Sequence, residues 1–147
     1  MPLPAEMARV FTEEKIDFVK RSGLKAEELL PGFVRLRMPL AGNQNHIGTL
    51  YAGALFTLAE IPGGALFLTS FHVQRIYPLI KEMKLRFPRP ATSDISVEAR
   101  LGTEEIERIQ NEAEREGKAE YRLELQLKDA DGQVVAETSA LYQLRKH

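Results

Sequence analysis

The segment YAGALFTLAEIPGG, residues 51–64, contains one acid, Glu60, inside the most apolar part of the chain. No other residue between Arg37 and Arg75 carries a formal charge when histidine is neutral. Burial of an unpaired carboxylate costs several kcal/mol, so folded proteins usually protonate such a group, pair it or use it in chemistry. Any fold or function assigned to this chain must therefore account for Glu60.

A buried central helix is the structure we predict for residues 50–71. The apolar run is too long for one strand, it lacks strict alternation, and its Ala, Leu and Phe residues favour helix. Pro62 predicts a kink, because proline lacks the N–H that would bond to the Leu58 carbonyl. A break with a second short helix at Pro62 is the alternative. A transmembrane span is a competing interpretation of this length, which Glu60, Pro62 and the glycine pair after it oppose.

The rest of the chain predicts one antiparallel sheet and two more helices. Three segments alternate apolar and polar residues, as strands with one buried and one wet face do. Strands are predicted over residues 32–40, 82–90, 94–101, 119–127 and 133–145, a hairpin turn at 129–132, and helices over 12–23 and from Thr103 to about Glu116. In the first helix we predict Thr12 as the N-cap, Phe11 and Ile16 as a hydrophobic staple, and Gly23 as the C′ residue.

These elements predict an α+β fold in a single domain, residues 1–147, with a curved sheet of about five strands wrapped around the long apolar helix. One sheet covers only part of a helix that is apolar on every side, so the remaining side must meet another surface. We expect that surface to be a second copy of the chain, with Gly53, Gly63 and Gly64 permitting close approach.

Composition excludes several classes of function. The chain has 147 residues, a net charge of −1 and no cysteine. It therefore has no thiolate metal ligand or cysteine nucleophile, and no overall charge suited to nucleic acid or an anionic membrane. Its first ten residues lack the pattern of a signal peptide, so we expect a cytoplasmic protein. His46 and His72 lack metal-ligand spacing and no phosphate-binding glycine loop is present, so we expect neither a metal nor another cofactor.

Glu60 is the first candidate catalytic residue. Desolvation would raise its pKa and suit it to act as a general base or nucleophile. The alternative is a structural acid that bonds to backbone groups or to a partner chain. Lys84, Arg86 and Arg89 cluster around one predicted strand, where they either form a solvated face or contact the phosphates of a carrier.

The loop and helix start that precede Glu60 hold the other candidates. Asn45 lies in a loop, where an Asn usually caps or turns the chain, and it becomes a site residue if it meets a substrate beside Glu60. If the central helix begins at Tyr51, Ala52 and Gly53, its free N–H groups suit a developing oxyanion. Small residues at a helix start also serve packing alone.

The stretch NHIGTLYAGALFTLAE, residues 45–60, resembles the signature region of hotdog-fold acyl-CoA thioesterases of the PaaI type and of their uncharacterised relatives. That pattern is Asn, five residues, His-Gly-Gly and, after six more residues, an acid closing Leu-Ala-Asp. Here Asn45 matches the Asn, Tyr51-Ala52-Gly53 stands at His-Gly-Gly, and Leu58-Ala59-Glu60 stands at Leu-Ala-Asp. The downstream segments KLRFPRPA and GQVVAETSALYQLR resemble the strand after the central helix and the closing strand of that family.

The resemblance implies a hotdog fold, in which a curved antiparallel sheet wraps a central helix and two chains build two active sites at their interface. It implies hydrolysis of an acyl-CoA thioester by a homodimer or homotetramer. Glu60 would activate water or attack the carbonyl, the helix start near Gly53 would bind the oxyanion, and Asn45 would orient water or carbonyl from either chain. Tyr51 replaces the family's His, Ala52 its first Gly, and Glu60 its Asp.

The residues leave three other functions open. A non-catalytic hotdog module would bind an acyl-CoA or another apolar ligand without hydrolysing it. A hydratase or dehydratase of the same fold would need an Asp and His pair at short spacing, which the chain lacks. A structural dimerisation domain would use Glu60 only to bond across its interface.

Overall fold

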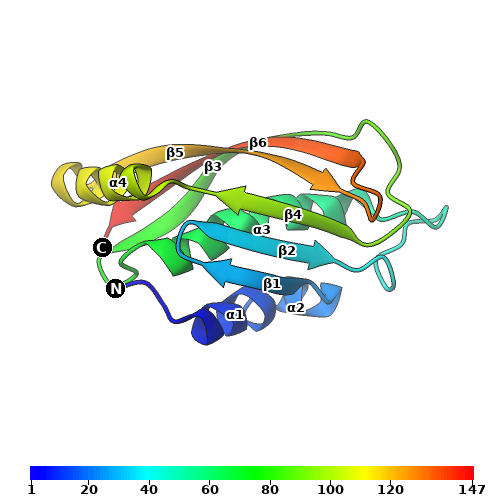
Figure 1. The fold of residues 1–147 in the computed structure, drawn as a ribbon, viewed down its shortest axis with the longest axis horizontal. Coiled ribbons are helices and arrows are strands. Elements are labelled where there is room, and N and C mark those ends of the chain that lie inside the picture. The colour runs from blue at the N-terminus through cyan, green and yellow to red at the C-terminus, as the bar shows by residue number, and fades with distance from the viewer.

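A computed structural model describes all 147 residues of the protein. Its elements are α1 (Ala5–Glu14), α2 (Asp17–Ser22), β1 (Lys25–Leu30), β2 (Phe33–Met38), α3 (Ala52–Ser70), β3 (Ile76–Arg86), β4 (Ile95–Arg100), α4 (Thr103–Glu116), β5 (Lys118–Lys128) and β6 (Val134–Lys146). The strands form one antiparallel sheet in the order β1-β2-β4-β5-β6-β3. The sheet curves around α3, with α1 and α2 beside β1 (Figure 1).

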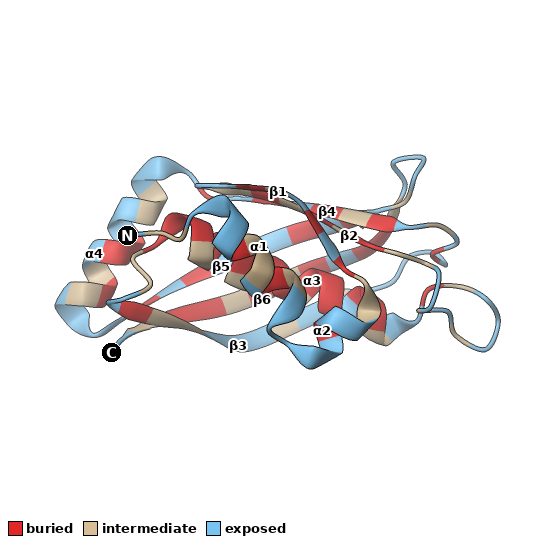
Figure 2. Cartoon of the chain, turned by 90° about the horizontal axis from the view of Figure 1, so that it is seen from below, coloured by how far each residue is buried: buried red, intermediate tan, exposed pale blue.

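The hydrophobic core lies between α3 and the concave face of the sheet. Leu58 and Leu66 of α3 are fully buried, and the helix packs mainly on β2 and β4. Figure 2 shows buried residues along α3, whereas α1 and α2 are mostly exposed. By length and composition α3 could cross a membrane, but 67% of its most apolar 18-residue window is buried inside the domain. In this fold α3 is therefore the core helix.

The predicted α+β architecture is confirmed. The central helix begins and ends within two residues of the predicted range, and α4 covers its predicted range with Ile109 and Ala113 buried. β5 shows the strict alternation of buried and exposed residues that its sequence predicts. α3 continues through Pro62 without interruption, so the alternative of a second short helix is wrong.

The first helix differs from the prediction. α1 begins after Pro4 and ends at Glu14, so Thr12 lies buried inside the helix and is not its N-cap. Proline suits a helix start because its φ is fixed near the helical value, and the residues after it favour helix.

The hydrophobic staple is also wrong. Ile16 separates α1 from α2 in an extended conformation, with φ −101° and ψ 112°, and the side chains of Phe11 and Ile16 are largely exposed. Gly23 ends α2 in the left-handed conformation, with φ 78°, as predicted. The N-terminal region is therefore two short helices that hold apolar side chains outside the core.

The sheet has six strands rather than the predicted five or so, because the sequence pattern of β1 is irregular. A β-bulge between Ala26 and Glu28 breaks its alternation. β3 begins at Ile76, six residues before the predicted strand, and ends at Arg86. It is an edge strand with few buried residues, so its period-two signal is weak, and Phe87 lies beyond it and is exposed.

Candidate active site

Glu60 lies in the middle of α3, on the face that the sheet does not cover. Its side chain is half-buried, and no hydrogen bond or ion pair within the chain holds the carboxylate. Burial raises the pKa of Glu60, because the charged form loses hydration and no cation compensates for it. The structure therefore does not support the alternative in which Glu60 is a structural acid bonded to backbone groups. No group of three or more His, Asp or Glu side chains is arranged to hold a metal ion.

The start of α3 presents free backbone donors on the same face. Tyr51 is the N-cap residue, and no side chain caps the helix. The Tyr51 carbonyl accepts from the N–H groups of Ala54 and Leu55, which leaves those of Ala52 and Gly53 without partners in the chain. Seven residues, about two helical turns, separate Gly53 from Glu60, so both lie on one face about 10 Å apart along the axis. Glu side chains lean toward the N-terminus of a helix, which shortens that separation.

Two cavities meet at Glu60 on this open face. The upstream cavity, about 450 Å³, lies beside the helix start and is lined by Tyr51 and, from α3, by Gly53, Phe56 and Thr57. The downstream cavity, about 290 Å³, lies toward the helix end and is lined from α3 by Gly64, Ala65, Phe67 and Leu68. Three residues line both cavities: Ile16, Glu60 and Ile61. The carboxylate therefore stands at the junction of two spaces with mostly apolar walls.

The N-terminal helices supply one wall of each cavity. Phe18 and Val19 of α2 line the upstream cavity, and Phe11 of α1 lines the downstream one. Pro78 of β3 lines the downstream cavity from the opposite side. In Figure 2 α1 and α2 lie in front of α3, and β3 runs along the edge of the sheet opposite β1.

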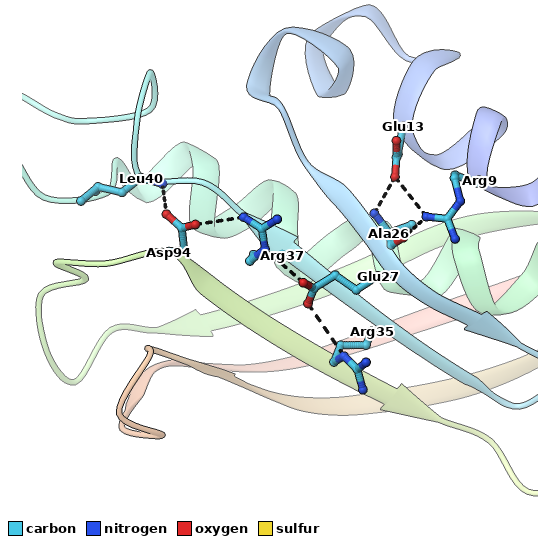
Figure 3. Close-up of polar contacts among 8 residues, drawn as sticks. All are labelled: Arg9, Glu13, Ala26, Glu27, Arg35, Arg37, Leu40 and Asp94. Carbon is cyan, nitrogen blue, oxygen red and sulfur yellow. Dashed lines mark hydrogen bonds and ion pairs between the residues drawn. The ribbon is translucent and has the colours of Figure 1, made fainter.

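Polar contacts to the edge strand β1 hold α1 in place (Figure 3). The Glu13 carboxylate accepts from the Ala26 N–H at 2.8 Å, and Arg9 donates to the Ala26 carbonyl. Arg9 and Glu13 also pair with each other, at 3.5 Å. These contacts occupy backbone groups of an edge strand that would otherwise be open. They fix the position of the cavity wall on α1.

Two tyrosines of the sheet support α3 from behind. The Tyr142 hydroxyl donates to the Glu60 carbonyl at 2.9 Å, and the Tyr121 hydroxyl donates to the Gly63 carbonyl at 3.4 Å. Their rings stack with centroids 5.4 Å apart. Burial raises the pKa of both hydroxyls, so both stay protonated donors. The backbone on either side of Pro62 is therefore anchored to the sheet.

Gly63 faces these tyrosines, not a second chain. A Cβ at this position would overlap the Tyr142 ring. The expectation that Gly63 allows close approach of a partner is therefore wrong: the close contact is with β6 of the same chain.

The side chain of Asn45 organises its own loop. Its Oδ1 accepts from the N–H groups of Ile47 and Thr49 at 3.0 and 3.1 Å, and its Nδ2 donates to the Thr49 hydroxyl at 2.7 Å. Asn45 lines a different cavity from Glu60, with Tyr51 between the two. The structure does not bring Asn45 and Glu60 together within one chain.

The predicted phosphate contacts lie at one end of the molecule. Lys84 and Arg86 belong to the last part of β3 and form no ion pair, and Arg89 follows the strand and donates to Gln133 at 2.8 Å. None of the three lines the cavities at Glu60. The end of β3 nevertheless lies at the same end of the molecule as the start of α3 (Figure 1).

Comparison with known proteins identifies the family. Residues 6–143 match the family described as a domain of unknown function, DUF4442. The chain belongs to the DUF4442 family. No protein of curated function matches it in sequence.

Solved structures place the DUF4442 chain among hotdog proteins. A crystal structure of a protein of unknown function from Pseudomonas aeruginosa, described as a probable thioesterase, is 69% identical, with a TM-score of 0.95 over 100% of this chain and 99% of that one. A mutant thioesterase from Pseudomonas aeruginosa gives 17% identity and a TM-score of 0.76, covering 100% and 97%. A mutant thioesterase enzyme from Staphylococcus aureus gives 14% and 0.71, covering 88% and 99%. The last two show the fold alone; together the comparisons confirm the hotdog fold and the resemblance to thioesterases.

The residues of this DUF4442 chain that come to Glu60 from outside α3 could not be predicted from its sequence. The pattern around Phe11 and Ile16 predicts a staple, and both line cavities instead. Aromatic and aliphatic residues left exposed on a short helix were the available signal. No signal indicates Tyr142, because 82 residues separate it from Glu60 and only the sheet brings them together.

Proposed function

We propose that this protein is a thioesterase that hydrolyses an acyl-CoA thioester to the free acid and CoA, with Glu60 as the catalytic residue. The observation that carries the proposal is the unpaired Glu60 carboxylate at the junction of two mostly apolar cavities on α3. A base with a raised pKa in a desolvated site suits removal of a proton from water. The thioesterase relatives support the same class of reaction.

The reaction begins with the thioester carbonyl beside the start of α3. Glu60 takes a proton from water as the water oxygen attacks the carbonyl carbon. The N–H groups of Ala52 and Gly53 donate to the oxyanion that forms. The carbon–sulfur bond then breaks, the proton on Glu60 passes to the leaving sulfur, and the products are a carboxylic acid and the CoA thiol. Direct attack by Glu60, through an anhydride that water then opens, is the alternative route.

A homodimer completes the proposed site. Phe18, Tyr51, Phe56 and Ile80 expose apolar surface over α2, α3 and β3, and β3 has no neighbour on its outer edge. Surfaces of this kind mark contact with another protein surface. A second copy would cover them, and its Asn45 loop is the proposed source of a group that orients water or the carbonyl. A dimer of dimers is equally compatible with these surfaces.

The CoA moiety would lie toward the basic end of the molecule. Lys84 and Arg86 belong to the last part of β3, which lies at the end of the molecule where α3 begins, and Arg89 follows that strand (Figure 1). Cations at that place suit the phosphates of CoA. Such a path leads from the phosphates to the helix start and then to Glu60. The chain itself would supply every group, with no added cofactor, in the cytoplasm where acyl-CoA is found.

A non-catalytic module that binds acyl-CoA or another apolar ligand is the second candidate. It is favoured by Tyr51, whose ring packs so closely on Gly53 that a Cβ there would overlap it. A ring in that place crowds the approach to the helix start. This candidate predicts thermal stabilisation by acyl-CoA with no release of CoA.

A panel of acyl-CoA substrates assayed with wild type and Glu60→Gln tests the proposal. Release of free CoA thiol should fall by about 100-fold to 10,000-fold in kcat/KM for Glu60→Gln, the range for loss of a general base. Glu107→Gln is the matched control, because it makes the same exchange of acid for amide at an exposed position of α4, away from both cavities. Equal turnover by wild type and Glu60→Gln would rule out the catalytic role, and stabilisation without turnover would favour the binding module.

A further inference from the structure

The downstream cavity is the part of the site that the proposed reaction leaves unused. It lies on the far side of Glu60 from the helix start, and its walls include Phe11, Phe67, Leu68 and Pro78. Apart from Glu60, its polar residues offer little to a ligand. The Thr12 hydroxyl is buried away from the surface, and the Lys15 ammonium lies over the Phe11 ring, 5.9 Å from its centroid.

Apolar walls of this kind suit only one part of an acyl-CoA molecule. The pantetheine arm carries two amides, and burying an amide without a hydrogen bond is costly. An alkyl chain has no such requirement and gains free energy for each methylene removed from water. Lys84 and Arg86 belong to the last part of β3, which lies toward the start of α3 (Figure 1), whereas Pro78 belongs to the first part of β3. The alkyl chain is therefore the part of the substrate that fits the downstream cavity.

Gly64 is the feature that packing does not explain. It lies one turn after Glu60 in the same helix face and lines the downstream cavity. A Cβ at Gly64 would have no atom within 4 Å, and its φ is not positive, so alanine would fit without strain. Glycine inside a helix costs about 0.5–1 kcal/mol relative to alanine. The chain thus keeps an open space beside the carboxylate where a side chain could stand.

We infer that the downstream cavity is the subsite for an apolar acyl chain and that Gly64 keeps it open next to Glu60. The inference rests on the proposed function for the identity of the reacting group, and it names the substrate class. The depth of the cavity, from Gly64 to Phe67, Leu68 and Pro78, then sets the length of acyl chain that the site accepts. The α1 wall, fixed on β1 by Arg9 and Glu13, sets the width.

Filling the cavity from Gly64 tests the inference. Gly64→Leu places a side chain into the cavity, and Gly102→Leu is the matched control, because a Cβ there also meets no atom and the residue lies at the start of α4. In Gly64→Leu, the ratio of kcat/KM for octanoyl-CoA to kcat/KM for acetyl-CoA should fall by about fourfold for each methylene excluded from the cavity. Gly102→Leu should keep the wild-type chain-length profile. The same loss for both substrates, or no loss for octanoyl-CoA, would overturn the inference.

A binding measurement separates this inference from the proposed reaction. Titration calorimetry with 1-octanol, an uncharged alkyl probe that the Glu60 carboxylate does not repel, should show binding to wild type and to Glu60→Gln but not to Gly64→Leu. If wild type hydrolyses no acyl-CoA, the proposed function fails, yet loss of octanol binding in Gly64→Leu still supports the subsite. Equal binding by wild type and Gly64→Leu, or no binding by wild type, would overturn it. The alternative occupant of the space at Gly64 is a second copy of the chain, and sedimentation velocity tests it. If the Gly64→Leu protein dissociates into monomers while its chain-length profile stays unchanged, Gly64 belongs to a contact between two copies and the inference is overturned.

Discussion

Gly63 and Gly64 are neighbours in α3, and they face opposite surroundings. Gly63 faces the sheet, where a Cβ would overlap the ring of Tyr142. Gly64 faces the downstream cavity, where a Cβ would meet nothing within 4 Å. The same residue type is therefore required by packing on one side of the helix and is unexplained by packing on the other.

The two faces of α3 differ in the same way along its length. On the sheet face the hydroxyls of Tyr121 and Tyr142 donate hydrogen bonds to backbone carbonyls of α3, and the apolar side chains of that face are buried. On the open face Glu60 has no polar partner and borders two cavities. The sheet face therefore contributes most to stability, and the open face carries the carboxylate that has no hydrogen-bond partner. Substitutions on each face should therefore change different measured quantities.

The largest expected effect on stability comes from Gly63→Ala. The added methyl group meets a Tyr142 ring that is buried, stacked on Tyr121 and hydrogen-bonded at its hydroxyl, so the ring cannot move aside easily. Overpacking of this kind costs about 1–3 kcal/mol or more. Urea denaturation should show that loss, whereas Gly64→Ala should gain about 0.5–1 kcal/mol. If Gly63→Ala and Gly64→Ala changed the free energy of unfolding by the same amount, the proposed difference between the two faces of α3 would be wrong.

A smaller effect is expected from Tyr142→Phe. This variant keeps the ring and removes the 2.9 Å hydrogen bond to the Glu60 carbonyl. A bond of this kind contributes about 1 kcal/mol, and more if the carbonyl is left buried without a donor. Tyr121→Phe is the matched control and should cost less, since its bond to the Gly63 carbonyl is longer, at 3.4 Å. A larger loss for Tyr121→Phe in the same denaturation experiment would contradict this ranking.

The smallest effect is expected from Glu13→Gln on α1. The variant replaces a charged acceptor of the Ala26 N–H by a neutral one and removes the pairing with Arg9. Global stability should fall by about 0.5–1 kcal/mol. Hydrogen exchange at the Ala26 amide should quicken, and KM for octanoyl-CoA should rise while acetyl-CoA is unaffected. Glu14→Gln, on the same helix without such contacts, should change none of these.

The sequence predicted the elements with a strong period and missed those without one. β5 alternates strictly, and α3 is apolar over most of its length, so both could be predicted from the sequence. β1 could not be predicted, because the bulge at Ala26 interrupts its alternation. The beginning of β3 was missed for another reason: an edge strand exposed on both sides leaves no alternating pattern.

The residues of the candidate site likewise fall into those that the sequence predicts and those that it does not. Glu60 could be predicted, because a lone acid in an apolar run is visible in the sequence itself. The helix start near Gly53 could also be predicted, as could the spacing of seven positions from Gly53 to Glu60. The walls on α1 and the Tyr142 contact could not, because both depend on which distant segments the sheet brings beside α3.

The pH dependence of kcat/KM for octanoyl-CoA tests the central claim, that Glu60 acts as an ionised base in a desolvated site. The base must be deprotonated, and burial raises its pKa, so activity should be lost as pH falls through a value above the ordinary glutamate value of 4.5. The residual activity of Glu60→Gln should lack that limb. A wild-type limb at or below 4.5, or the same limb in Glu60→Gln, would contradict the account.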